Sequence, residues 1–173
     1  MGLLPLLCGL ATARSLGAAA RIKWPNDVLL GEKKVCGILT EASFDMESGG
    51  LDYVISGIGV NVYEPEGGFP PEIQKVAGAL FPKPIPGIRN RLCSLILIKF
   101  MKYYEELAQG TFVNRYIARS CVIGKEIQVI CGNEAYMARA VDIDTNCNLI
   151  VETESGTVKK LSSGKISIKG EFA

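Results

Sequence analysis

Histidine is absent from the 173-residue sequence, which removes the commonest general base and the commonest transition-metal ligand. Any chemistry must therefore come from lysine, carboxylate, amide or backbone groups. Blocks of like charge are also missing, and the formal net charge is +1, so no nucleic-acid or anionic-membrane partner is indicated for this segment. The first twenty residues are apolar, but Arg14 interrupts them and the run is too short to span a bilayer.

Closely spaced cysteine pairs are a further absence, although the chain contains six cysteines. None forms a C-x-x-C motif, and most lie within apolar runs, so we interpret them as buried thiols in a reducing compartment. The six are Cys8, Cys36, Cys93, Cys121, Cys131 and Cys147. With 48% apolar residues, the chain is long enough for one modest domain with a small satellite and needs no disulfide framework.

The first third of the sequence predicts one buried helix followed by strands. Residues 21–30 combine apolar residues with the turn formers Pro25, Asn26 and Asp27, which indicates strand, turn and strand. Residues 34–43 and 51–62 are predicted to form a hairpin. Residues 51–62 are almost continuously apolar, so we expect a central strand covered on both faces.

The middle of the sequence changes to a helical pattern. We expect a short helix from Pro71 to Leu80 and a long helix over about 88–109, with Gly110 as its C-terminal stop. Thr111 is placed to cap a further short helix that runs to about Arg119.

From residue 122 onward, apolar residues recur at every second position, the spacing of a β-strand. Five short strands are expected, at 126–130, 135–143, 149–153, 157–161 and 165–168, and the turns between them predict a small barrel or sandwich. We place the domain boundary near residue 121, which gives domains of 1–120 and 121–173. The predicted fold class is α+β, with a mixed or antiparallel sheet and helices followed by the small β-barrel.

Three short segments carry the candidate chemistry: residues 23–27, 34–39 and 57–61. In a hairpin, Lys34 can lie near Asn61, with the Asn26–Asp27 turn beside them. Lysine and amide donors with nearby glycines suit an anion such as a phosphate or a carboxylate. Such residues more commonly represent a solvated lysine, a turn asparagine and an ordinary glycine-rich strand end. The G-x-G motif is followed here by Val-Asn and so is not a dinucleotide fingerprint.

One further motif begins like a calcium loop, at residues 142–146. Cys147 stands where the turn glycine belongs and Thr153 where the bidentate glutamate belongs, so a hairpin turn is expected instead.

Taken together, the motifs resemble those of biotin protein ligases. The sequence has KWPNDV at 23–28, a lysine eleven positions after the first with Gly-Ile-Leu behind it, GIGVN at 57–61 and SSGKISIKG at 162–170. The resemblance covers essentially the whole chain, and this combination is far more specific than any one piece. It implies the second half of a class II synthetase-like catalytic domain followed by an SH3-like domain.

The resemblance also implies an activity. Biotin and ATP with Mg²⁺ would form biotinyl-5′-adenylate, and the biotin would then pass to a lysine of the biotin carboxyl carrier protein or domain of a biotin-dependent carboxylase. A cytoplasmic enzyme that forms a homodimer is expected. Lys34 matches the catalytic lysine between the biotin carboxylate and the ATP α-phosphate. The positions that match the family's nucleotide contacts are Asn26, Asp27, Asn61 and, more weakly, Lys23. Asp27 also matches a position near Mg²⁺. The positions that match the biotin slot are Lys34, Gly37, Ile38, Gly57 and Ile58.

The family's glycine–arginine-rich loop and its strand of small hydroxylated residues are not found in these 173 residues, and the family's order would put both before residue 1. We therefore expect this chain alone to be inactive and to expose a strand edge and apolar helix faces. Two other functions stay open: a non-catalytic module that binds nucleotide or carrier, and a lipoyl or octanoyl transferase. KWPND and the C-terminal barrel favour biotin over lipoate.

Overall fold

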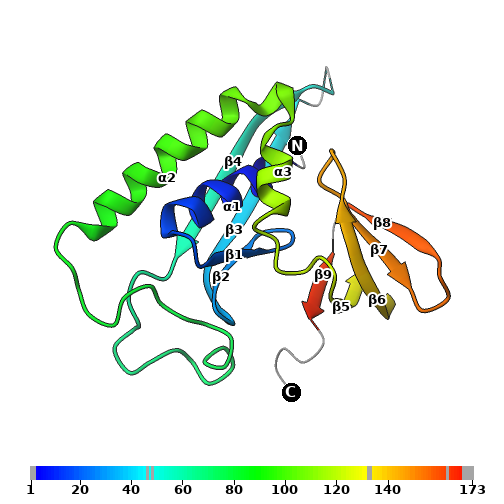
Figure 1. The fold of residues 1–173 in the computed structure, drawn as a ribbon. Coiled ribbons are helices and arrows are strands. Elements are labelled where there is room, and N and C mark those ends of the chain that lie inside the picture. The colour runs from blue at the N-terminus through cyan, green and yellow to red at the C-terminus, as the bar shows by residue number, and fades with distance from the viewer. Residues whose placement is uncertain (1–2, 46, 48, 132–133, 163, 169–173) are drawn as a thin grey trace.

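Two antiparallel sheets follow one another along the chain, and helices pack on the first (Figure 1). This computed structural model describes residues 3–45, 47, 49–131, 134–162 and 164–168. The helices are α1 (Leu3–Leu16), α2 (Ile88–Glu105) and α3 (Phe112–Ile117), with a 3₁₀ turn at Leu107–Gln109. The strands are β1 (Ala20–Lys23), β2 (Asp27–Leu30), β3 (Lys33–Phe44), β4 (Leu51–Val60), β5 (Glu126–Cys131), β6 (Glu134–Ile143), β7 (Leu149–Thr153), β8 (Val158–Leu161) and β9 (Lys165–Ile168). The predicted α+β fold class is confirmed.

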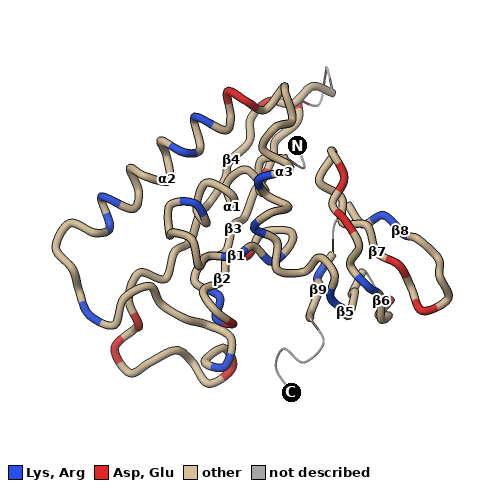
Figure 2. The backbone as a smooth tube through the Cα atoms, viewed as in Figure 1, with Lys and Arg blue, Asp and Glu red and all other residues tan. Residues whose placement is uncertain are grey.

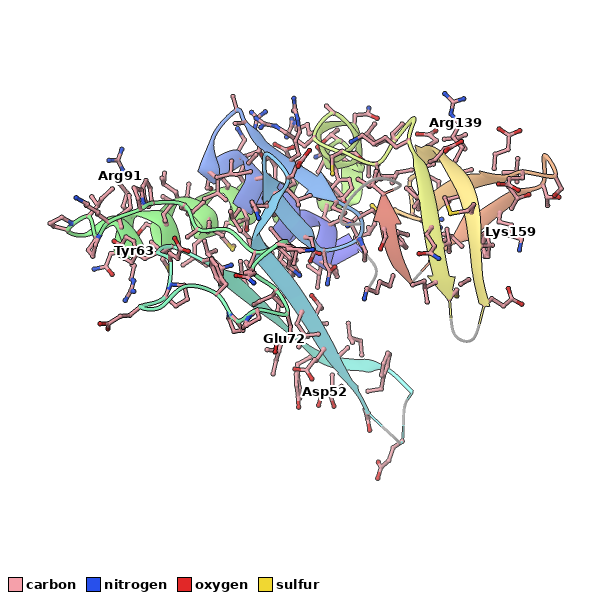
Figure 3. All side chains as sticks on the ribbon, turned by 90° about the horizontal axis from the view of Figure 1, so that it is seen from below. Asp52, Tyr63, Glu72, Arg91, Arg139 and Lys159 are labelled. Atoms are coloured by element: carbon pink, nitrogen blue, oxygen red, sulfur yellow. The ribbon has the colours of Figure 1, made fainter. Side chains whose placement is uncertain are left out.

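The first sheet is a meander of order β1-β2-β3-β4. Gly31, with a φ of 58°, makes the tight turn between β2 and β3. The β3–β4 hairpin is in register with Ile38 opposite Ile58 and Gly37 opposite Gly59. Figure 3 shows this long hairpin extending away from the body of the molecule, with Asp52 on its outer part.

Helix α1 covers one face of this sheet and contacts all four strands. Its residues Leu7 and Leu10 are fully buried in a core that also contains Ile22 and Ile38. The opposite face of the β3–β4 hairpin exposes large apolar side chains, with exposed fractions of 53–63% at Leu39, Phe44, Leu51, Tyr53 and Ile55.

Strand β4 differs from the prediction. Within the described residues it pairs only with β3, so it is an edge strand and not a central one. Its odd-numbered residues are exposed and most of its even-numbered residues are partly buried. An unbroken apolar sequence cannot distinguish cover on both faces from one open face. Helix α2 likewise exposes Leu97, Ile98, Met101 and Tyr104, in line with the expected apolar helix faces.

The helix expected from Pro71 to Leu80 is also wrong. Residues 70–77 form consecutive turns, and the segment then joins the sheet at Lys34, whose N–H donates to Val76 O at 2.7 Å and whose carbonyl accepts from Gly78 N–H at 2.9 Å. Two isolated i+4 bonds form, from Gln74 N–H to Pro70 O at 2.9 Å and from Ala77 N–H to Ile73 O at 2.7 Å, but the short segment is bounded by prolines and does not continue as a helix. Helix α3 is present, but Thr111 makes no capping bond and its hydroxyl instead donates to Glu106.

The second sheet has the order β8-β7-β6-β5-β9, and its five strands confirm the five predicted from the sequence. Its core is joined to that of the first sheet in one apolar cluster. The chain between the sheets runs beside β1: Ile22 N–H donates to Arg119 O at 2.8 Å and Cys121 N–H donates to Ile22 O at 2.9 Å.

The cysteines are all free thiols, but not all are buried. Cys93 on α2 and Cys131 at the end of β5 are exposed, while Cys121 is partly buried. The remaining three, Cys8, Cys36 and Cys147, lie in the core as expected. Basic and acidic residues are spread over both sheets in Figure 2, and α2 carries basic residues along most of its length before its acidic end. Among the described residues, no helix is long and apolar enough to cross a membrane.

Candidate active site

The centre of the site is an ion pair between the first residue of β2 and the second residue of β3. Lys34 Nζ in β3 lies 2.6 Å from Asp27 Oδ1 in β2, and the two side chains are 44% and 25% exposed. A β-bulge produces this pairing: Val28 pairs with Cys36 and Leu29 with Lys34, so one extra residue is inserted in β3. Because such a residue reverses the alternation of side chains, the bulge turns Lys34 onto the face that carries Asp27.

Gly37 gives the lysine side chain its space. A Cβ atom at this position would lie 3.1 Å from Lys34 Cε and 3.2 Å from Nζ. Lys34 therefore crosses directly over the backbone of Gly37 to reach Asp27, which is the strand partner of Gly37. A side chain at residue 37 would force the ammonium group to move.

Two further glycines keep the adjoining surface flat. Gly57 and Gly59 face Leu39 and Gly37 across the hairpin, and their absent side chains would stand 3.8 and 3.7 Å from carbonyl oxygens. The result is a shallow open pocket beside the ammonium group, lined by Asn26, Lys34, Gly37, Ile38, Leu39, Gly57, Ile58 and Gly59. An elongated apolar ligand with a terminal anion fits this arrangement of a flat floor and one cation.

Asn26 is fixed by two hydrogen bonds to one residue of β3. Its side-chain Nδ2 donates to Ile38 O at 2.7 Å, and its own carbonyl accepts from Ile38 N–H at 3.0 Å. The Ile38 side chain is 3% exposed and packs toward Gly9 of α1. Ile38 therefore meets the pocket through its backbone, and its side chain belongs to the core.

Asn61 is not brought into this pocket. Its N–H donates to Val35 O at 2.8 Å, so its backbone lies next to Lys34 along the hairpin, but its side-chain amide donates to Gly78 O at 3.0 Å. It lines a separate groove between β4 and α2, where Arg89 stacks over the Tyr63 ring at 5.2 Å. Tyr63 is labelled in Figure 3 beside the green helix.

A second cleft lies on the other side of Asp27, between the two sheets. Residues of the first sheet and its connecting turn form one wall, and β9 forms the other. The lining includes three lysines and one carboxylate: Lys23, Lys34, Lys165 and Asp27. Sequence reasoning missed the β9 residues and the Val76–Gly78 segment, because both reach the site only through tertiary packing.

The thiol of Cys36, next to Gly37 in β3, is buried. Burial and the nearby Asp27 charge raise the pKa of the Cys36 thiol to about 12, against the smaller opposing effect of Lys34. The thiol therefore stays protonated at neutral pH and serves as a packing group. Among the described residues, no group of three or more Cys, Asp or Glu side chains could hold a metal ion.

Comparison with known proteins identifies the family. Residues 6–61 match the model of the biotin/lipoate A/B protein ligase family, and residues 122–169 match that of the biotin protein ligase C-terminal domain. The chain belongs to the biotin protein ligase family. It is 33% identical over 173 residues to the bifunctional ligase/repressor BirA of Bacillus spizizenii, and 30% identical to the biotin–[acetyl-CoA-carboxylase] ligase of Mycobacterium tuberculosis.

These alignments cover 95% and 91% of this chain, but 52% and 59% of the respective relatives. The chain thus spans about half the length of the curated relatives it matches. Among solved structures, the biotin protein ligase of Aquifex aeolicus in complex with biotin and ATP superposes with a TM-score of 0.75 at 26% identity, over 95% of this chain and 70% of that one. Its apo structure gives a TM-score of 0.77.

Proposed function

We propose that this chain carries the Lys34 half of a biotin protein ligase active site, which activates biotin with ATP and transfers it to a lysine of a biotin carboxyl carrier domain. The observation that carries the proposal is the Lys34 ammonium group, held by Asp27 over a floor of three glycines. The family membership supports this chemistry. The C-terminal domain match supports biotin over lipoate as the substrate.

In the first half-reaction, a biotin carboxylate oxygen attacks the α-phosphate of ATP and pyrophosphate leaves. We assign Lys34 to the carboxylate and α-phosphate oxygens, where its positive charge stabilises the charge that builds up in the transition state. Gly37, Gly57 and the Ile38 and Ile58 backbones form the biotin floor. In the second half-reaction, the carrier lysine amine attacks the mixed anhydride and AMP leaves.

The nucleotide is assigned to the side of the site that faces Asp27. Asn26 and Lys23 border this side. Asn61 stays a proposed nucleotide contact through its backbone, which is bonded to Val35 next to Lys34, because its side chain lines the separate groove. Mg²⁺ usually enters with nucleotide phosphates and takes one or two carboxylates from the protein. Among the residues that the structure describes, Asp27 is the acidic residue that lines the site and fits this role. A homodimer and a cytoplasmic location complete the proposal and rest on the resemblance, the free cysteines and the use of ATP.

The test uses two proteins. One is the 173-residue chain, and the other is a chimera in which the part of the Bacillus spizizenii relative that precedes the matched region is joined to residue 1. Each is incubated with biotin, MgATP and a carrier domain, and the mass of the carrier is followed. We expect the chimera to add one biotin and the chain alone to add none.

Two results would overturn the proposal. A chimera that is folded but inert with several carriers supports a non-catalytic binding module. A chimera that attaches lipoate or octanoate in place of biotin supports a transferase of the related class.

A further inference from the structure

The turn that carries Asn26 and Asp27 is held from outside the first sheet. Trp24, 2% exposed, donates its indole Nε1–H to the Cys147 carbonyl in the second sheet at 3.0 Å. The fully buried Tyr116 of α3 donates its hydroxyl to Pro25 O at 3.1 Å. These two bonds fix the backbone on the N-terminal side of Asn26.

The acceptor of the indole bond is itself held in place. Cys147 has a φ of 63° in the β6–β7 turn, a backbone conformation that non-glycine residues rarely adopt. The Asp144 carboxylate maintains this turn by accepting bonds from the Asn146 and Asn148 N–H groups and from the Asn148 amide, at 2.9–3.1 Å. The acidic motif at 142–146 thus holds the Cys147 carbonyl facing Trp24.

The other end of the turn leads to the catalytic lysine. Asn26 is bonded twice to Ile38, and Asp27 holds Lys34 at 2.6 Å. An unbroken sequence of contacts therefore runs from the second sheet, through Trp24 and the turn, to the ammonium group.

We propose that Trp24 is a positioning residue, and that its hydrogen bond to Cys147 O lets the C-terminal sheet fix the Asn26–Asp27 turn on which the placement of Lys34 depends. The C-terminal sheet then contributes to the nucleotide side of the site through this bond as well as through the β9 residues that line the cleft. The effect on catalysis rests on the proposed function, but the mechanical coupling does not.

The first experiment needs no activity. Trp24→Phe removes the indole donor and keeps an aromatic ring, and hydrogen exchange is measured at the Ile38 amide, which donates to Asn26 O. We expect exchange about tenfold faster than in the unaltered chain, because one bond that holds the turn is lost. Leu149→Ala is the control, because it removes buried volume from the second sheet without altering a donor to the turn.

Tyr116→Phe provides a second variant that removes one hydroxyl from the same turn, should Trp24→Phe not fold. Its Ile38 amide is expected to exchange about threefold faster. The unaltered chain has one tryptophan, so its single indole N–H resonance also reports whether the bond to Cys147 is formed. Unchanged exchange at Ile38 in the folded variants, or an equal change in Leu149→Ala, overturns the proposal.

The second experiment uses the chimera. Trp24→Phe is expected to raise KM for ATP about fivefold and KM for biotin by no more than about twofold, because biotin shares only the Lys34 contact with ATP and the rest of its floor lies on β3 and β4. A general loss of stability would lower both affinities or neither. If the unaltered chimera is inert, the proposed function fails, while the exchange measurement still decides the coupling.

Discussion

Two lysine–carboxylate pairs of nearly equal length differ in what surrounds them. Lys34 lies 2.6 Å from Asp27 in the first sheet, and Lys160 lies 2.7 Å from Asp144 in the second. Asp144 also accepts hydrogen bonds from its own turn, whereas Lys34 lies against an open glycine floor. Equal ion-pair geometry therefore does not identify a site; the room left for a ligand beside the cation does.

The sharpest test of this difference removes each lysine. We expect Lys34→Ala in the chimera to lower the rate of biotinyl-adenylate formation about 10²- to 10³-fold, because a cation on the reacting oxygens is lost. Lys160→Ala should leave the rate within about twofold, since an exposed ion pair contributes at most about 1 kcal/mol to stability. Pyrophosphate release measures both, and equal losses in the two variants would contradict the distinction.

The carboxylates are compared next. Asp27→Asn keeps the size of the side chain and removes the charge that holds Lys34, so we expect adenylate formation to fall about tenfold at nearly unchanged stability. Asp144→Asn should have the opposite effect, with lower stability and a rate of adenylate formation that stays within about threefold, because Asn146 and Asn148 still close the turn. Single-turnover kinetics and thermal unfolding on the same samples separate the two effects. A larger loss of rate in the Asp144 variant would show that the turn acts on catalysis directly.

The strands were predictable because their signals are local. Turn residues separate the five strands of the second sheet, and the Pro25–Asp27 turn separates β1 from β2. The grouping of Asn26, Asp27 and Lys34 could be anticipated from the hairpin order, although the roles assigned to them stay predictions. The bulge at Val35, which turns Lys34 onto its face, depends on the register between strands and leaves no local signal.

Other features depend on what packs nearby. Strand β4 is equally apolar whether one face or both are covered, and the Pro71–Leu80 segment exchanges its expected helix for bonds to Lys34. Asn61 is directed to Gly78 by that same segment, so its separation from the pocket could not be anticipated. The donor bond from Trp24 to Cys147, 123 residues away, is formed by tertiary packing and leaves no local signal.

A smaller effect is expected on stability as a function of pH. Partial burial alone would raise the pKa of Asp144, but hydrogen bonds from Asn148 and Lys160 outweigh it and hold the pKa well below its usual range. A lowered folded-state pKa stabilises the fold above the unfolded value of about 4, and this contribution is lost as the pH falls toward the folded value. Asp144→Asn should therefore be less stable by about 1–2 kcal/mol at pH 7.

The unfolding free energies of the two proteins should converge as the pH falls below about 4, which urea titrations at several pH values measure. A gap that stays constant down to pH 2 would mean that the charge of Asp144 does not stabilise the turn.

The smallest effect concerns the glycine floor. In Gly37→Ala the new methyl group would lie 3.1 Å from Lys34 Cε, so the flexible end of the lysine must shift by a few tenths of an ångström. We expect adenylate formation to fall about fivefold with stability nearly unchanged, because the ammonium group is displaced from the reacting oxygens. Gly9→Ala in α1 is the control: its methyl group meets Ile38, Ile22 and Tyr116 at an ordinary 3.6–3.8 Å, and alanine favours the helix by up to about 1 kcal/mol. If both variants keep full activity, the space above Gly37 is not needed to place Lys34, and the open floor no longer distinguishes the two ion pairs.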